Sequence, residues 1–180
     1  MKATSVFRFT LKLFVKTSVI IVFLQFVFVQ QTTIVAQTPP ELEISRWHNT
    51  KEPLELRKLK GKLVLLDFWG IWCGGCVANI PKLTKLRETF STEELEIITI
   101  HTPFQSNGIE KFIKKYNYAL IVGVDKRDPD DKQTHYGLTT KSFKIKEFPS
   151  YVIVDRAGFI VKVFEETLPS EDQIRKVLNK

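Results

Sequence analysis

The sequence predicts an α/β fold in which a central mixed β-sheet is flanked by helices. Two continuous apolar runs, at 61–70 and 94–102, indicate buried strands, and a segment with helical character follows each of them. Residues 150–166 carry a hairpin signal, and residues 169–180 predict a final helix. Strand–helix–strand order favours parallel pairing and a hairpin requires antiparallel pairing, so together they predict a mixed sheet.

The first part of the folded chain supplies a hairpin, a strand and a helix. Residues 42–61 ("LEISRWHNTKEPLELRKLKG") predict a short amino-terminal hairpin that leads into the core. The run "GKLVLLDFWG" at 61–70 is typical of a strand buried on both faces. A helix is expected from Cys76 onward, because apolar residues recur there at helical spacings of three and four. These residues are Val77, Ile80, Leu83, Leu86 and Phe90.

The middle of the chain predicts an inserted helix and strand. "ELEIITIHT" at 94–102 indicates a second buried strand, and "GIEKFIKKYN" at 108–117 a short amphipathic helix. "YALIVGVD" at 118–125 predicts a third strand. The polar stretch at 126–137 predicts a loop with room for one helical turn, because Pro129 and clustered aspartates favour turns.

The carboxyl-terminal part predicts two strands joined by a turn, and then a helix. In "SYVIVDRAGFIVKVFEE" at 150–166, the turn residues "DRAG" separate two apolar segments. In "PSEDQIRKVLNK" at 169–180, acids in the first turn and lysines near the end indicate a helix that Ser170 caps.

Residues 1–36 predict a secretory signal peptide, which leaves 37–180 as the folded domain. Four basic residues and no acid accompany an apolar run of about 12 residues, "SVIIVFLQFVFV", and Ala36 is the expected cleavage point. That run is short for a membrane span, which needs about 20 residues. The alternative is an uncleaved amino-terminal anchor. A lipid-anchored form is not expected, because no cysteine follows the apolar run. Both predictions place the folded part outside the cytoplasm, in the periplasm or cell envelope.

The charge pattern argues against a nucleic-acid partner. The net charge is +7, and four of the positive charges lie in residues 1–36, which leaves +3 for the rest of the chain. Basic residues there are interspersed with acids, as in "KEPLELRKLKGK" and "DKRDPDDK". Such a mixture indicates a solvated surface and no basic stripe. Charge and composition give no basis for an oligomer.

The only two cysteines, Cys73 and Cys76, lie in "WCGGC" at the junction between the first core strand and its helix. A structural disulfide gains most from a long loop, and this loop is too short to gain much. A zinc site needs three or four ligands, and no second cysteine pair exists. The three histidines, His48, His101 and His135, show no metal-binding spacing and are expected on the surface or in loops. We therefore expect neither a metal nor another cofactor.

Redox chemistry explains the position of the pair better. At the start of a helix, Cys73 lies beside unpaired backbone N–H groups and the positive end of the helix dipole, which lower the pKa of a thiol. Its thiolate is then available to attack a substrate disulfide, and Cys76 can resolve the mixed disulfide by attacking Cys73. A CxxC motif between a buried strand and an amphipathic helix is a much stronger signal than CxxC alone.

From about Leu42 to the carboxyl end, the sequence resembles the thioredoxin superfamily, and in particular its extracytoplasmic TlpA/ResA-like thiol-disulfide oxidoreductases. "GKLVLLDFWGIWCGGCVANIPKL" is similar to the active-site segment of that family, and "FKIKEFPSYVIVDRAGFIV" to its cis-proline segment and following hairpin. "ITIHT", followed by a helix and then by "YALIVGVD", resembles the part of that branch that carries its extra helix and strand. The resemblance implies a thioredoxin-like fold with an inserted helix and strand.

The resemblance also implies roles for individual residues. Cys73 matches the exposed nucleophile and Cys76 the buried resolving thiol. Pro149 matches the family's cis-proline, which would leave the Phe148 backbone free to pair with an extended substrate. Trp72 matches the aromatic residue that shields the cysteines and faces the substrate. Asp67 matches a buried acid that accepts the Cys76 proton, although it could instead be a structural acid.

Position 75 departs from the family, because it is Gly where most relatives carry Pro between the cysteines. Glycine gives the reduced loop more conformational freedom, so reducing strength cannot be transferred from relatives.

The predicted function is thiol-disulfide oxidoreduction, with reduction of disulfides in exported proteins as the expected direction. Apocytochromes awaiting haem attachment would be among the substrates, and an extracytoplasmic or membrane electron donor would restore the dithiol. A peroxiredoxin-like peroxidase is a weaker alternative, because that class wants Thr where this chain has Gly70. A non-catalytic binding module is the other alternative, and the joint presence of both cysteines, Asp67 and Pro149 disfavours it.

Overall fold

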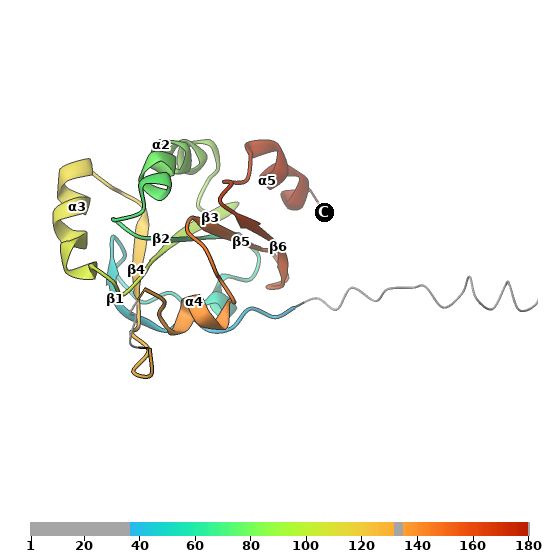
Figure 1. Cartoon of the computed structure of the whole chain (residues 1–180). Helices are drawn as coiled ribbons and strands as arrows, with labels where there is room; N and C mark the ends of the chain where they lie inside the picture. The colour runs from blue at the N-terminus through green and yellow to red at the C-terminus, as the bar shows by residue number, and fades with distance from the viewer. Residues whose placement is uncertain (1–36, 132–134, 180) are drawn as a thin grey trace, which may run out of the picture. The chain divides into compact units, whose positions relative to one another are not determined.

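The central sheet has six strands in the order β1-β4-β3-β2-β5-β6 (Figure 1). A computed structural model describes residues 37–131 and 135–179. Strand β2 (Leu63–Trp69) lies inside the sheet, parallel to β3 (Leu95–His101) and antiparallel to β5 (Ser150–Val154). The predicted mixed sheet is therefore confirmed.

The outer strands extend the sheet in both directions. Strand β4 (Ile121–Asp125) is parallel to β3, and β1 (Ile44–His48) pairs antiparallel with β4 at one edge. Strand β6 (Ile160–Glu165) pairs antiparallel with β5 at the other edge, which confirms the predicted hairpin. In its turn, the Asp155 carboxylate accepts a hydrogen bond from the Phe159 N–H at 2.9 Å.

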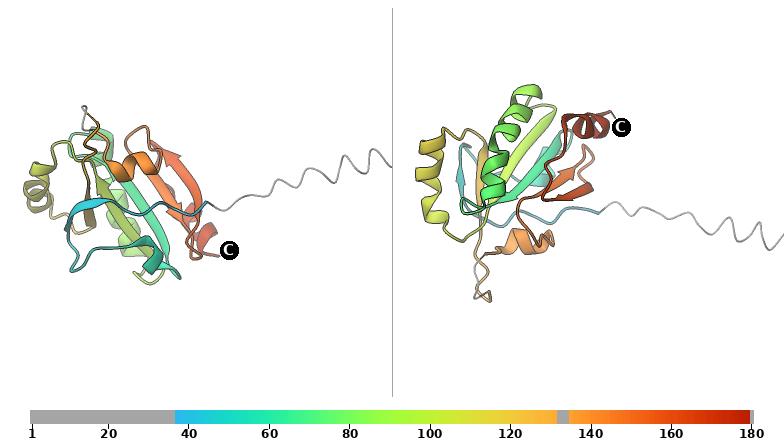
Figure 2. Two further views of the ribbon diagram at one scale, coloured as in Figure 1. Left: turned by 90° about the horizontal axis from the view of Figure 1, so that it is seen from below. Right: turned by 45° about the horizontal axis from the view of Figure 1, so that its top comes forward.

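Three helices cover one face of the sheet and two short helices cover the other (Figures 1 and 2). Helices α2 (Gly74–Thr89), α3 (Ile109–Tyr116) and α5 (Glu171–Leu178) lie on the first face. The 3₁₀-helix η1 (Leu56–Leu59) and helix α4 (Leu138–Ser142) pack against the second. Helix α3 and strand β4 are the inserted pair that the sequence predicts.

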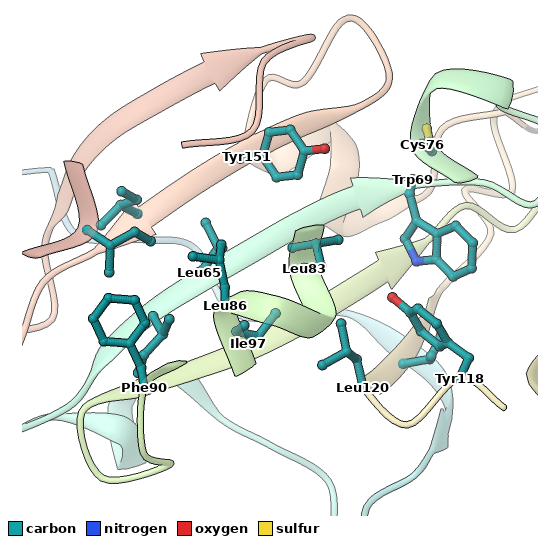
Figure 3. Packing of buried hydrophobic residues seen from close by; sticks show 14 of the residues in the cluster. Leu65, Trp69, Cys76, Leu83, Leu86, Phe90, Ile97, Tyr118, Leu120 and Tyr151 are labelled. Carbon is teal, nitrogen blue, oxygen red and sulfur yellow. The ribbon is translucent and has the colours of Figure 1, made fainter. Parts of the chain in front are cut away.

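The core has two layers because β2 is buried on both sides. Leu63, Leu65 and Trp69 face α2, α3 and α5, and Figure 3 shows part of this larger layer. Val64, Leu66 and Phe68 face the opposite layer, which also contains Leu56 and Phe143. Every residue of β2 is buried, as expected for a continuous apolar run. The strand that leads to the cysteines is thus fixed from both faces.

Helix α5 begins with the predicted serine cap. The Ser170 hydroxyl accepts a hydrogen bond from the Gln173 N–H, and the Gln173 side chain accepts one from the Ser170 N–H at 2.8 Å. This reciprocal arrangement satisfies two backbone donors at the helix start.

The predicted amino-terminal hairpin over 42–61 is wrong. Only β1 forms a strand there, and it pairs with β4, which is distant in sequence. Asn49 takes a left-handed conformation after β1 and donates hydrogen bonds to the Tyr118 and Leu120 carbonyls, both at 2.8 Å. The rest of the segment turns into η1 because Leu56 can be buried against the sheet there. Strand β1 pairs with the edge of β4, whose backbone groups need partners, and not with a neighbouring segment of the chain.

Helix α4 was not predicted from the sequence. The described part of the 126–137 loop contains no helix, and α4 begins directly after it. The buried Asp125 carboxylate accepts hydrogen bonds from the Thr139 and Thr140 N–H groups at 2.9 and 2.8 Å. It also accepts one from the Thr140 hydroxyl at 2.7 Å. A residue at the end of β4 therefore satisfies the first donors of α4, a partnership that local patterns cannot indicate.

The predicted signal peptide or anchor, residues 1–36, lies outside the described residues. Across 37–131 and 135–179, none of the helices combines the length and the apolar character that crossing a bilayer requires.

Candidate active site

The two cysteines form a disulfide at the point where β2 passes into α2. Cys73 is the residue that caps α2, and its Sγ atom accepts a hydrogen bond from the Cys76 N–H at 3.1 Å. Cys76 lies inside the first turn and is 3% exposed. Upon reduction, a Cys73 thiolate at this position would gain from the same N–H group and from the helix dipole.

Cys73 is less exposed than expected. Its exposed fraction is 8%, so it is the more accessible of the two sulfurs by a small margin only. Both cysteines belong to the larger core layer, and Ile71 and Phe148 pack against that layer. These side chains therefore restrict access to the disulfide.

The proline predicted to be cis lies against the cysteine loop. The Phe148–Pro149 peptide bond is cis, which confirms that part of the prediction. A Cβ atom added at Gly75 would lie 3.7 Å from the Pro149 Cδ atom, an ordinary van der Waals distance. Neither the Phe148 N–H nor its carbonyl has a backbone partner within 37–131 and 135–179. The residue before the cis-proline therefore keeps both of its backbone groups out of the sheet.

Asp67 is buried in β2 on the sheet face that α2 covers. Its backbone neighbours across the sheet are Thr99 on β3 and Tyr151 on β5. Burial raises the pKa of Asp67 to about 8, and no hydrogen bond or charge among the described residues offsets that effect. Burial and the charge of Asp67 raise the pKa of the Tyr151 hydroxyl and of the Tyr118 hydroxyl as well.

Other buried polar groups accompany Asp67 on this face. The Tyr151 hydroxyl accepts a hydrogen bond from Asn79 on α2 at 3.0 Å. Trp69 and Tyr118 lie with ring centroids 5.5 Å apart (Figure 3). Neither the Trp69 Nε1 atom nor the Tyr118 hydroxyl has a hydrogen-bond partner among the residues that the structure describes. An acid without compensating bonds is costly to keep here for structure alone, which favours a chemical role.

Trp72 belongs to a set of aromatic side chains at the mouth of the site, which we call the aromatic rim. Its indole is 40% exposed and contacts Phe148 at a centroid distance of 5.8 Å, edge to face. The rim consists of Trp72, Phe104, His135, Tyr136 and Phe148. The sequence indicated only two of these residues, because the others come from loops without periodicity.

Gly70 makes room for the indole of Trp72. A Cβ atom at position 70 would lie 2.5 Å from the Trp72 Nε1 atom, which is closer than real contacts allow. The indole therefore lies against the backbone of Gly70, and a larger residue there would displace it.

His101 is a residue whose position the sequence did not reveal. The prediction of a surface or loop position is wrong, because His101 is fully buried at the end of β3. Its Nε2 atom accepts a hydrogen bond from the Ile71 N–H at 3.0 Å, and its Nδ1 atom donates to the Thr102 carbonyl at 2.6 Å. Burial is the main cause that lowers its pKa to about 4. A neutral imidazole thus holds the backbone two residues before Cys73.

The other two histidines lie elsewhere. His135 is exposed in a loop, as expected, and contacts the aromatic rim. His48 is half-buried in β1 and accepts a hydrogen bond from Arg46 at 3.1 Å. Within the described ranges, no group of three or more His, Cys, Asp or Glu side chains is arranged to hold a metal ion.

Comparisons with known proteins support a redox reading of this site. The model of the Redoxin family matches residues 35–178. The chain is 29% identical over 113 residues to "Thiol-disulfide oxidoreductase ResA" of Halalkalibacterium halodurans, which covers 62% of this chain and 58% of that protein. It is 23% identical over 146 residues to the protein of that name in Geobacillus thermodenitrificans, covering 81% and 78%. With the first of these relatives, the match therefore spans little more than half of the relative's length.

Solved structures share the fold. A thioredoxin-like superfamily protein superposes with a TM-score of 0.73 at 26% identity and covers 81% of this chain and 98% of its own. A thiol-disulfide isomerase from Corynebacterium glutamicum superposes with a TM-score of 0.71 at 22% identity and with the same coverage, which is evidence for the fold alone.

Proposed function

This chain belongs to the Redoxin family, and from that membership we propose that it is a thiol-disulfide oxidoreductase with Cys73 and Cys76 as its reactive pair. The observation that carries the proposal is the disulfide at the start of α2, where the Cys73 Sγ atom accepts a backbone hydrogen bond. A purely structural crosslink over so short a loop would stabilise little. The ResA names of the relatives support the same activity.

The reduced enzyme acts in two exchange steps. The Cys73 thiolate attacks one sulfur of a substrate disulfide and forms a mixed disulfide, while the other substrate sulfur leaves as a thiolate and takes up a proton. Cys76 then loses its proton and attacks the Cys73 sulfur, which releases the second substrate thiol. The substrate gains two electrons, and the enzyme returns to the disulfide state that the structure contains.

Asp67 accepts the proton of Cys76 in the second step, directly or through a water molecule. Its pKa of about 8 is close to the ordinary value of a thiol, so proton transfer between the two groups is nearly balanced. The absence of compensating hydrogen bonds among the described residues supports this role over a purely structural one.

Substrate docks at Phe148, Pro149 and Trp72. The free backbone groups of Phe148 pair with an extended substrate segment as an added strand would. The exposed indole of Trp72 supplies apolar contact beside the same opening.

The direction of the reaction is reduction of disulfides in exported proteins, outside the cytoplasm. Apocytochromes awaiting haem attachment are candidate substrates, and an extracytoplasmic or membrane thiol donor restores the dithiol. The basic and apolar residues 1–36 support this compartment. A peroxidase is disfavoured, because peroxiredoxin-like enzymes carry a threonine at the position of Gly70. A threonine there would collide with the indole of Trp72.

Reduction of insulin disulfides by the prereduced protein tests the activity, and equilibration with glutathione or dithiothreitol buffers gives the reduction potential. We expect Cys73→Ser to abolish turnover and Cys76→Ser to accumulate the mixed disulfide. A potential near the roughly −270 mV of thioredoxin supports a reductase, whereas one near the roughly −120 mV of DsbA reverses the proposed direction. Full turnover by Cys73→Ser would refute the mechanism.

A further inference from the structure

A groove of about 490 Å³ lies beside the disulfide, between the start of α2 and helix α3. Trp72, Gly74 and Val77 line it on the cysteine side, and Phe112 and Tyr116 line it on the α3 side. Trp72 and Gly74 flank Cys73 in the chain, so the groove lies next to the reactive pair. Pro149 does not line the groove, which therefore adds surface to that of the cis-proline segment.

The groove exposes aromatic surface that the fold does not need to expose. Four large hydrophobic side chains are exposed among the described residues, and two of them, Trp72 and Tyr116, line this groove. Their exposed fractions are 40% and 48%. Val77, which is partly buried, and Phe112, which belongs to the buried core, also line it. An exposed apolar patch with aromatic members is typical of a recognition surface.

The charged residues that line the groove are both lysines. Lys111 and Lys115 lie one helical turn apart on α3, and no Asp or Glu lines the groove with them. Neither lysine forms an ion pair with another residue of 37–131 or 135–179. The Lys115 ammonium lies 5.0 Å from the centroid of the Tyr116 ring. The groove therefore combines an apolar lining with uncompensated positive charge.

We propose that this groove selects disulfide substrates in which the segment beside the reactive cysteine carries a bulky apolar side chain flanked by Asp or Glu. The proposal rests on the oxidoreductase function and adds its substrate class. The apolar side chain packs between Trp72 and Tyr116, and the flanking carboxylates pair with Lys111 and Lys115. Charge complementarity at the edge of a binding surface mainly raises the rate of association and the discrimination between substrates.

Two disulfide-bonded peptides test this preference. They share a phenylalanine beside the cysteine and differ only in its neighbours, which are acidic in one peptide and lysine in the other. We expect the prereduced protein to reduce the acidic peptide with a kcat/KM roughly tenfold higher, and raised salt to diminish that ratio. The double variant Lys111→Glu/Lys115→Glu should lose or invert the preference.

A matched control separates local from global charge effects. The double variant Lys82→Glu/Lys85→Glu makes the same change in net charge on α2, where both lysines line a different pocket. It should keep the preference of the unmodified protein. Hydroxyethyl disulfide, which is small and uncharged, should be reduced by all three proteins, which shows that each retains a working cysteine pair.

The outcomes distinguish the two proposals. The recognition proposal would be overturned by equal rates for both peptides, or by an unchanged preference in the Lys111→Glu/Lys115→Glu variant. Reduction of hydroxyethyl disulfide in the same experiment would still support the oxidoreductase function. No reduction of any disulfide by the unmodified protein would overturn both proposals.

Discussion

The imidazole of His101 accepts a hydrogen bond from the backbone N–H of Ile71 at 3.0 Å and so ties the end of β3 to the segment that precedes Cys73. This bond joins the end of one strand to the turn that follows the neighbouring strand, and its acceptor, His101, is buried while Ile71 is half-buried. Loss of the acceptor would leave the partly buried Ile71 N–H without its protein partner. The turn before the cysteines depends on this side chain for its position.

We expect His101→Phe to lower the free energy of unfolding by about 1–3 kcal/mol, because it leaves the Ile71 N–H unsatisfied. Chemical denaturation of the oxidised protein measures the change. His135→Phe is the matched control, since His135 is exposed and a phenylalanine can keep its ring contacts, and it should stay within about 0.5 kcal/mol of the unmodified protein. Equal stability of both variants would contradict the anchoring role.

The same histidine predicts a pH effect. The pKa of His101 is lowered to about 4 in the folded protein, whereas an unfolded histidine titrates near 6.5. As the pH falls from about 6.5 to about 4, the unfolded chain takes up a proton that the folded chain does not, so this residue makes stability fall in that window. Denaturation curves recorded between about pH 6.5 and pH 4 should show this decrease in the free energy of unfolding for the unmodified protein. The decrease should be smaller in His101→Phe, which has no imidazole to titrate.

Asp67→Asn should affect turnover and stability in opposite directions. Loss of the proton acceptor should slow resolution of the mixed disulfide about 100-fold, measured by stopped-flow mixing of the reduced protein with insulin. The pKa of Asp67 is raised to about 8, so its contribution to stability is present below the unfolded pKa near 3.8 and is lost as the pH rises through 8.

The Asn variant should therefore be more stable than the unmodified protein at pH 8–9, and the advantage should shrink toward pH 4. A rate of resolution equal to that of the unmodified protein, together with higher stability, would make Asp67 a structural acid.

Gly70→Ala should displace the indole of Trp72, because its Cβ atom would lie 2.5 Å from the Trp72 Nε1 atom. We expect a loss of about 1–3 kcal/mol in stability, since the close contact forces a shift in the surrounding structure. Gly74→Ala is the control, because nothing lies within 4 Å of the added Cβ atom there. Thermal unfolding should separate the two alanines, and identical melting temperatures would show that the indole moves freely.

Asp125→Ala should destabilise the protein by about 3 kcal/mol, because two backbone N–H groups and the Thr140 hydroxyl lose their acceptor. Thr140→Val removes only the hydroxyl bond and should cost about 1 kcal/mol. A double-mutant cycle measured by denaturation should show coupling between these neighbours. Strict additivity would mean that the carboxylate does not hold α4 through this threonine.

The sequence was sufficient for the features that depend on local patterns. Burial on both faces of β2, the helix after it and the serine cap of α5 follow from hydrophobic spacing and from backbone donors that need local partners. The CGGC pair was found in the same way, since its position between strand and helix is itself a local property.

The failures concern partners that are distant in the sequence. The sequence of β1 predicts one strand of a local hairpin, but in the fold β1 pairs with the edge of β4, which is distant in sequence. Helix α4 is short, and its cap comes from Asp125 on another element. His101 looks like any polar residue at the end of a strand, because its partner, Ile71, lies on a different turn. Only the folded arrangement brings these groups together.

The cysteine pair and the charged side of the groove lie on different helices, α2 and α3. The proposed redox chemistry uses β2 and the start of α2. The two lysines of the groove belong to the inserted helix α3, whose buried residues Ile109 and Phe112 anchor it to the core. Residues at its exposed positions can therefore change without disturbing the cysteines or the sheet. Evolution or engineering could change the preferred substrate by substituting the α3 residues that line the groove, Lys111, Lys115 and Tyr116, while the cysteine pair stays unchanged.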